Sequence, residues 1–187
     1  MMASRPDFTV GRDLVGRAYD YALAIYQGPG VEAGADIDHP TAVAALVDAA
    51  GFTDEAVAAA VLHDIVEDTE TEPAAIASRF GDEIGGWVGV LTEDVSISDY
   101  ARRKAEHRRR VLASGSVPVT IYLADKLART RAFIETGEQI DPQRLDHYWD
   151  TLQLYAGRRP ELPFLTELAA ELPELEPGAV ESPGPSG

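Results

Sequence analysis

Four polar side chains interrupt an apolar stretch of the sequence, AAAVLHDIVEDT (58–69): His63, Asp64, Glu67 and Asp68. In a continuous helix His63 would lie above Glu67, and Asp64 above Asp68, because residues four apart share a face. The aliphatic residues around them are core residues by pattern, and three carboxylates there would be costly to bury without a counter-charge. A divalent cation is the simplest counter-charge, since imidazole and carboxylate together are natural ligands for a transition metal.

A solvated helix face would explain an isolated polar block equally well, because exposed helices commonly carry charges. Two other segments favour the metal site. His39 lies in IDHP, at the start of a helix opened by proline, and Asp125 follows an apolar run in IYLADK. Asp125 by itself could simply pair with Lys126. Together with His63 and Asp64, however, these residues supply two imidazoles and two carboxylates from three separate helices.

Prolines, glycines and capping residues divide the chain into segments of helical period, so the predicted fold class is all-α. The run VTIYLA (119–124) is ambiguous between strand and helix by period alone. Asp82 and Ser98 are expected N-caps, and Thr53 is expected to cap one long helix through the polar block. The predicted helices cover residues 11–27, 40–50, 54–69, 73–81, a segment after each of Asp82 and Ser98, 117–136, 142–157 and a short segment from Pro160.

The composition limits the class of protein. With 187 residues the chain can form one domain, expected at 1–172, followed by a flexible acidic tail rich in Pro, Gly and Ser at 173–187. A net charge of −16 disfavours non-specific nucleic-acid binding. No apolar run could span a membrane, no signal peptide opens the sequence, and there are no cysteines, so we expect a cytoplasmic protein.

The longer motifs resemble a known family. The segments DHPTAVAALV, AAVLHDIVEDTE and IYLADKLARTR are similar to those of the alarmone hydrolase domains of RelA/SpoT proteins and of small alarmone hydrolases. These belong to the HD superfamily of metal-dependent phosphohydrolases. The resemblance covers roughly residues 11–157 and implies an HD-domain helical bundle. HDxxEDT is a specific signal when HP precedes it and LADKL follows it at this separation, whereas HD alone is common.

The resemblance also implies a mechanism. One manganese ion would have four protein ligands: His39, His63, Asp64 and Asp125. Glu67 and Asp68 match the family's catalytic acidic pair, which positions and activates the attacking water. This fits the chemistry, because a divalent metal lowers the pKa of water and an adjacent carboxylate can accept its proton. The family reaction removes the 3′-pyrophosphate of a guanosine alarmone, (p)ppGpp, and leaves GDP or GTP. A chain of this size is expected to hydrolyse only.

Four further side chains are expected at the nucleotide substrate. Lys126 matches the lysine of the family's ADKL segment, and Lys104 matches a phosphate-contacting lysine. Arg129 stands where the family has an asparagine that contacts the sugar; being longer and always charged, it could reach a phosphate instead. Tyr148 could stack on a base, or simply pack in the core. The basic run RRKAEHRRR (102–110) could form a local basic platform or a solvated helix face. His107 and His147 are expected to be surface or half-buried residues.

Two further departures from the family pattern, together with Arg129, leave the substrate open. Tyr26 stands near a usual histidine, and VEAG (31–34) replaces a basic pair that helps to hold guanine. The same chemistry on an adenosine alarmone, or on a pyrophosphorylated tRNA 3′ end as an antitoxin, is therefore an alternative. An HD 5′-nucleotidase is another. A protein that binds an alarmone or a toxin partner with little turnover is a third, and a homo-oligomer is also open.

Overall fold

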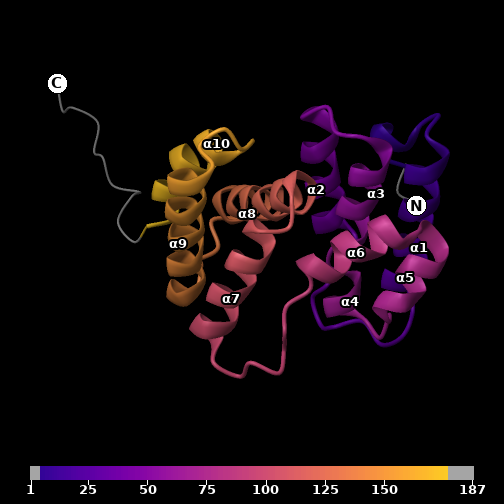
Figure 1. Ribbon diagram of the computed structural model, residues 1–187, viewed down its shortest axis with the longest axis horizontal. Coiled ribbons are helices and arrows are strands. Elements are labelled where there is room, and N and C mark those ends of the chain that lie inside the picture. The colour runs from indigo at the N-terminus through magenta and orange to yellow at the C-terminus, as the bar shows by residue number, and fades with distance from the viewer. Residues whose placement is uncertain (1–4, 177–187) are drawn as a thin grey trace.

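A computed structural model of the chain describes residues 5–176 (Figure 1). Within that range the chain forms ten α-helices and two short 3₁₀ helices, η1 (Asp7–Thr9) and η2 (Leu172–Leu175), and no strand. The predicted all-α class is thereby confirmed. The α-helices are α1 (Asp13–Tyr26), α2 (Asp38–Ala49), α3 (Asp54–Leu62), α4 (Ile65–Asp68), α5 (Pro73–Phe80), α6 (Asp82–Leu91), α7 (Tyr100–Leu112), α8 (Ser116–Thr136), α9 (Pro142–Arg158) and α10 (Leu165–Glu171).

Helix α3 runs through the core. Every residue from Ala56 to Leu62 has 0% exposed surface. The sequence AVAAAVL is apolar on all faces, so this helix can only be stable when other helices surround it. It packs against α1, α2 and α6, and its alanines let those helices approach closely. The predicted cap is present, since the Thr53 side chain accepts from the N–H of Ala56. This packing fixes the position of the residue that follows α3, His63.

Helix α8 crosses the middle of the molecule. Figure 1 shows α1 to α6 on one side of it and α9 and α10 on the other. It contacts α2, α3 and α6 on the first side, and α7, α10 and η2 elsewhere. The ambiguous run 119–124 lies inside α8 and is entirely buried, so tertiary packing decides its type. The helix ends at Gly137, whose φ of 68° is the left-handed conformation that glycine adopts easily. Asp125 lies near the middle of α8.

Four predicted boundaries were wrong. The helix expected at 54–69 is broken at His63 and Asp64 into α3 and α4. Gly81 rather than Asp82 stands at the N-cap of α6, and Asp99 rather than Ser98 caps α7 through its side chain. The last helix begins at Leu165 instead of Pro160. In each case the apolar pattern located the helix, but local hydrogen bonds and packing set its end.

The ordered fold continues beyond the expected start of the tail at 173. Helix η2 covers Leu172–Leu175, with Leu172 buried and Leu175 packed against the core. The remainder of the predicted tail, 177–187, lies outside the described residues. In the part of the chain that is described, none of the helices combines the length and the apolar character needed to cross a bilayer.

Candidate active site

The break between α3 and α4 brings four side chains from three parts of the fold together. We call this group the metal cluster; its members are His39, His63, Asp64 and Asp125. One potential ligand atom from each lies within 4.8 Å of all the others. Nε2 of His39 is 2.8 Å from Oδ1 of Asp125 and 3.7 Å from Oδ2 of Asp64. Nε2 of His63 is 3.1 Å from Oδ1 of Asp64. The arrangement fits a single divalent cation bound by imidazole and carboxylate.

The ring of His63 is oriented for metal binding. Its Nδ1 lies 2.7 Å from the carbonyl oxygen of Ala60. Because a carbonyl only accepts, Nδ1 carries the proton and donates, which leaves the Nε2 lone pair free in the neutral ring. Nε2 is buried and makes no well-aligned hydrogen bond among the described residues, although Oδ1 of Asp64 lies 3.1 Å away. A buried nitrogen of this kind, fixed from behind by a backbone acceptor, is typical of a histidine ligand.

The electrostatics of the cluster also favour a cation. Burial lowers the pKa of His63, but the negative charges of Asp64 and Asp125 outweigh it and raise that pKa to about 9. Burial opposes ionisation of Asp125, yet the charge of Lys126 and the contact with His39 hold its pKa well below the usual value. Positive charge is therefore strongly preferred at this point, and a metal ion would supply it in place of a proton.

Glu67 and Asp68 follow the metal cluster on α4, and each is held by a different partner. The backbone N–H of Glu93 donates to Oε1 of Glu67 over 2.6 Å. The hydroxyl of Tyr26 donates to Oδ2 of Asp68 over 2.8 Å. Burial within the cleft and the charge of Asp64 raise the pKa of both carboxyl groups, that of Glu67 to about 7. Tyr26, a departure from the family pattern, thus holds one carboxylate of the predicted catalytic pair.

Four basic side chains line the same cleft as the metal cluster. We call them the basic wall: Lys104, Lys126, Arg129 and Arg144. Lys126 pairs with Asp125, and its Nζ lies 4.1 Å from the ring centroid of Tyr122 and 5.7 Å from that of Tyr148. Lys104 pairs with Glu93. The predicted substrate contacts Lys104, Lys126, Arg129 and Tyr148 therefore all lie at the cleft, with Tyr148 buried beneath Lys126.

The cleft of about 170 Å³ shares Asp68, Arg129 and Arg144 with a wider groove of about 790 Å³. The groove lies between the 32–36 loop, α2 and the second half of α8. Its walls include four carboxylates besides Asp68 and an apolar surface of alanines and Phe133. Together the two spaces have the size of a site for a small molecule such as a nucleotide.

The sequence did not identify several residues of the cleft. Glu93, Tyr100, His107, Tyr122, Arg144 and His147 line it. Arg144 is four residues before Tyr148 on α9, so helical spacing from the predicted tyrosine could have indicated it. His107 and His147 are buried, not surface residues. Glu93 gave no signal, because its partners come from other elements.

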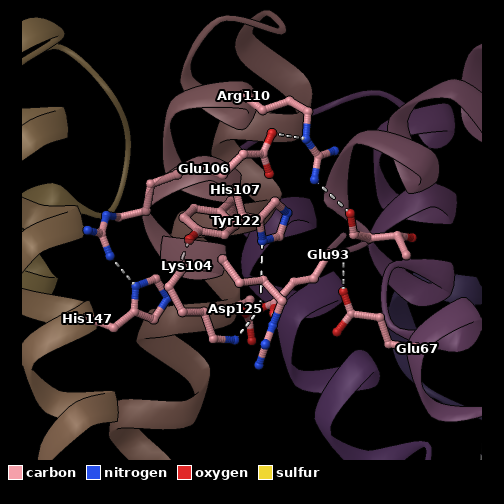
Figure 2. Close-up of polar contacts among 12 residues, drawn as sticks. Glu67, Glu93, Lys104, Glu106, His107, Arg110, Tyr122, Asp125 and His147 are labelled. Carbon is pink, nitrogen blue, oxygen red and sulfur yellow. Dashed lines mark hydrogen bonds and ion pairs between the residues drawn. The ribbon is translucent and has the colours of Figure 1, made fainter. Parts of the chain in front are cut away.

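The basic run 102–110 is mostly used within the fold, so neither of the two alternatives, a local platform or a solvated face, describes Arg103, Arg108 and Arg110. Arg103 donates to Glu93, and Arg108 donates to Nδ1 of His147 and to Asp150. Arg110 donates to Glu106 and to the backbone carbonyls of residues 90 and 92. Figure 2 shows Arg110 paired with Glu106. It also shows the ring of His147 joined by a dashed line to a second arginine side chain.

The family of this protein follows from its sequence as well as from its geometry. A family model described as "HD domain" matches residues 18–159, most of the chain. The chain belongs to the HD domain family. The predicted family resemblance is therefore confirmed. The metal cluster corresponds to a general property of HD domains, which bind divalent metals.

The curated relatives are much longer proteins. "GTP pyrophosphokinase rsh" of Brucella suis is 30% identical over 156 residues, which is 81% of this chain and 20% of that protein. "Guanosine-3′,5′-bis(diphosphate) 3′-pyrophosphohydrolase" of Aquifex aeolicus is 28% identical over 143 residues, 75% of this chain and 20% of that protein. The chain thus spans about a fifth of the length of these relatives.

Solved structures share the fold. A protein described as a metazoan ortholog of SpoT that hydrolyses ppGpp superposes with a TM-score of 0.69 at 21% identity, covering 91% of this chain and 96% of that one. A protein of Listeria monocytogenes superposes with a TM-score of 0.65 at 27% identity, covering 76% of this chain and 98% of that one. The helical fold of this chain is therefore also found in solved chains that it covers almost completely.

Proposed function

We propose that this HD-domain protein is a manganese-dependent hydrolase that removes the 3′-pyrophosphate of guanosine alarmones. The substrate would be (p)ppGpp, and the products GDP or GTP and pyrophosphate. The observation that carries the proposal is that one cleft is lined by His63, Asp64 and Asp125 of the metal cluster, by Glu67 and Asp68, and by the basic wall. The printed name of the Aquifex aeolicus relative supports the same reaction. We further propose that the chain only hydrolyses and that it acts in the cytoplasm.

The metal cluster would hold one manganese ion through His39, His63, Asp64 and Asp125. When bound, the ion supplies a Lewis acid and positive charge beside the phosphate. His63 is already in the required tautomer, because its Nδ1 proton is donated to Ala60. Lys126 pairs with Asp125 and so limits the motion of that ligand.

Glu67 is the proposed general base. A carboxylate whose pKa is raised toward neutrality accepts a proton more readily than an ordinary one. Asp68 orients the same water, with Tyr26 keeping its carboxylate in place. The water attacks the phosphorus bonded to the ribose 3′ oxygen, and its proton passes to Glu67. The bond from that phosphorus to the 3′ oxygen breaks and pyrophosphate leaves intact. The 3′ oxygen takes up a proton from solvent and becomes a 3′-hydroxyl, and Glu67 returns its proton to solvent.

The basic wall is the proposed binding site for the pyrophosphate group. Lys104, Lys126, Arg129 and Arg144 offer four positive charges to an anion that the net charge of −16 would otherwise repel. Arginine side chains bind phosphate in a bidentate manner, which also orients it. Tyr148 lies against Lys126 and would contact the nucleoside only by its edge, because the residue is 4% exposed.

An adenosine alarmone is a second candidate substrate. The groove where the nucleoside would lie carries Glu32, Asp36, Asp38 and Glu138. It has no lysine or arginine in the 31–34 segment, where the family holds guanine with a basic pair. The reaction on the pyrophosphate would be unchanged, because Glu67 and three of the four metal-cluster residues line the smaller cleft and not the groove.

A product assay tests the proposal. Purified protein with Mn²⁺ is offered ppGpp, ppApp and ordinary 5′-nucleotides in parallel, and the products are separated by ion-exchange chromatography. Intact pyrophosphate released from ppGpp, and absent with an Asp64→Ala variant, is the expected result. A higher rate on ppApp would select the second candidate. Orthophosphate released from 5′-nucleotides, with both alarmones untouched, would contradict the proposal and indicate a nucleotidase.

A further inference from the structure

Glu93 is a charged residue at the back of the cleft that neither the metal cluster nor the proposed reaction uses. It lies in the segment between α6 and α7, and its side chain is only 11% exposed. Nε of Arg103 donates to its Oε2 over 2.9 Å, and Nζ of Lys104 contacts its Oε1. Nδ1 of His107, a buried atom with no hydrogen-bond partner among the described residues, is 3.8 Å from the same oxygen.

The main chain of Glu93 has a separate contact with the proposed catalytic residue. Its N–H donates to Oε1 of Glu67 over 2.6 Å. Figure 2 shows Glu93 between Glu67 on one side and Lys104 and His107 on the other. One residue therefore connects the carboxylate that would activate water with the ammonium that would bind phosphate. A side-chain substitution at position 93 changes the second contact and leaves the N–H of the first.

The charge of Glu93 is maintained in this environment. Burial opposes its ionisation, but the contacts with His107, Lys104 and Arg103 outweigh burial and hold the pKa of Glu93 far below the ordinary value. Lys104 is therefore charge-paired in the substrate-free protein. Any phosphate that binds Lys104 must share it with a carboxylate already in contact, and that carboxylate also repels the phosphate.

We propose that Glu93 is a positioning residue that acts through Lys104: it holds the ammonium at the cleft wall and, as a fixed counter-anion, weakens the binding of pyrophosphate there. The inference rests on the function proposed above. The contact between Glu93 and Lys104 is useful because tight binding and fast turnover are different requirements. Strong binding of substrate and product alike does not accelerate a reaction, and it slows the release of a highly charged product. Lys104 with its charge partly offset by Glu93 stays in position and does not retain the pyrophosphate product.

The test measures the binding of inorganic pyrophosphate to the full chain with Mn²⁺ by calorimetry. Glu93→Gln removes the negative charge but keeps the side-chain size and the N–H to Glu67. We expect pyrophosphate to bind roughly five- to tenfold more tightly, as removal of one unit of nearby repulsion would give. In steady-state assays KM should fall, kcat should fall because the ammonium is less well fixed, and inhibition by pyrophosphate should strengthen. A merely structural role would lower the active fraction and leave KM unchanged.

Three further variants isolate the effect. Glu106→Gln is the matched control, because Glu106 pairs with Arg110 on the same helix but does not line the cleft; it should bind pyrophosphate as the wild type does. Glu93→Asp retains the charge and should stay within about twofold of the wild type. In a Lys104→Met background the Glu93→Gln change should have little further effect, because the residue through which Glu93 acts is gone.

The outcomes separate this inference from the proposed function. Equal pyrophosphate affinity in wild type and Glu93→Gln, or an equal gain in the Lys104→Met background, would overturn the role of Glu93. Thermal unfolding of each variant shows whether it keeps its fold. If Glu93→Gln does not fold, Glu93→Asp decides: pyrophosphate affinity within about twofold of the wild type supports the role of Glu93, and a larger change overturns it. If the wild type binds pyrophosphate but releases none from alarmones, the proposed function fails while the coupling between Glu93 and Lys104 is still measured.

Discussion

The two walls of the cleft are built in different ways. In the metal cluster one potential ligand atom from each of the four side chains lies within 4.8 Å of the others, and the contact of His63 Nδ1 with Ala60 leaves Nε2 as the nitrogen that binds a metal once it loses its proton. In the basic wall, Lys104 and Lys126 already have carboxylate partners in the protein, Glu93 and Asp125. Asp64 of the first wall has no lysine or arginine partner among the described residues, whereas these two lysines of the second wall are already paired, Lys126 with the metal-cluster residue Asp125.

This difference separates what each wall must do. A metal ligand set must hold its ion through many turnovers, so a carboxylate such as Asp64, which has no lysine or arginine partner in the described part of the chain, is useful there. A phosphate site must bind and then release a highly charged group, so charges that are already paired are an advantage. We therefore expect changes in the metal cluster to be all-or-none, and changes in the basic wall to be graded.

The largest effect is expected from Asp64→Ala. The substitution removes one of the two carboxylate ligands of the metal cluster. His39, His63 and Asp125 then remain as the ligands. Metal and activity should be lost together, with turnover reduced on the order of a thousandfold or more. Metal content after dialysis, measured by mass spectrometry, and pyrophosphate release are the two readouts. A variant with full metal occupancy and normal turnover would show that the cluster is not the catalytic centre.

A smaller but still severe effect is expected from Glu67→Gln. The residue lies beside the metal cluster but is not a member of it. Metal content should therefore stay close to that of the wild type, while kcat falls by about 10²- to 10⁴-fold because the amide cannot accept the proton. Wild-type turnover by a metal-loaded Glu67→Gln protein would contradict the role of general base.

Arg144→Met should produce a graded loss in the basic wall. Arg144 is exposed on α9 and lines both the cleft and the groove, so its removal leaves the core intact. Loss of one charge-assisted phosphate contact should lower kcat/KM about 10- to 100-fold, with metal content unchanged. Arg158→Met, at the end of the same helix and outside the cleft, is the control. An equal loss from both variants would refute a local role for Arg144.

The pH dependence should be the mildest of these effects. The proposed base is active as a carboxylate, so kcat/KM should fall as the pH decreases and Glu67 becomes protonated. Its pKa of about 7 in the metal-free protein sets an upper bound on the midpoint, because a bound cation stabilises the carboxylate and lowers it. Below the midpoint the rate should drop about tenfold per pH unit. A midpoint above pH 8 would be inconsistent with Glu67 as the group that titrates.

The sequence by itself determined the all-α class, the HD domain family and the short motifs in which the predicted ligands occur. This was possible because HP, HDxxEDT and LADKL are contiguous in the chain, and helical period is a local property. Helix α3 is the clearest case: an all-round apolar segment must be buried, so the polar residues directly after it stood out.

Tertiary structure alone decided where that helix ends and which charges are free. The break at His63 is accompanied by a hydrogen bond from its ring to Ala60, which the helical period does not encode. Likewise Arg103 and Arg108 resemble one another in the sequence, but their partners differ. Arg103 pairs with Glu93, whereas Arg108 pairs with His147 and Asp150. Glu93 itself gave no sequence signal. Ion pairs between separate helices depend on how those helices pack. The spacing of residues along the chain does not predict that packing.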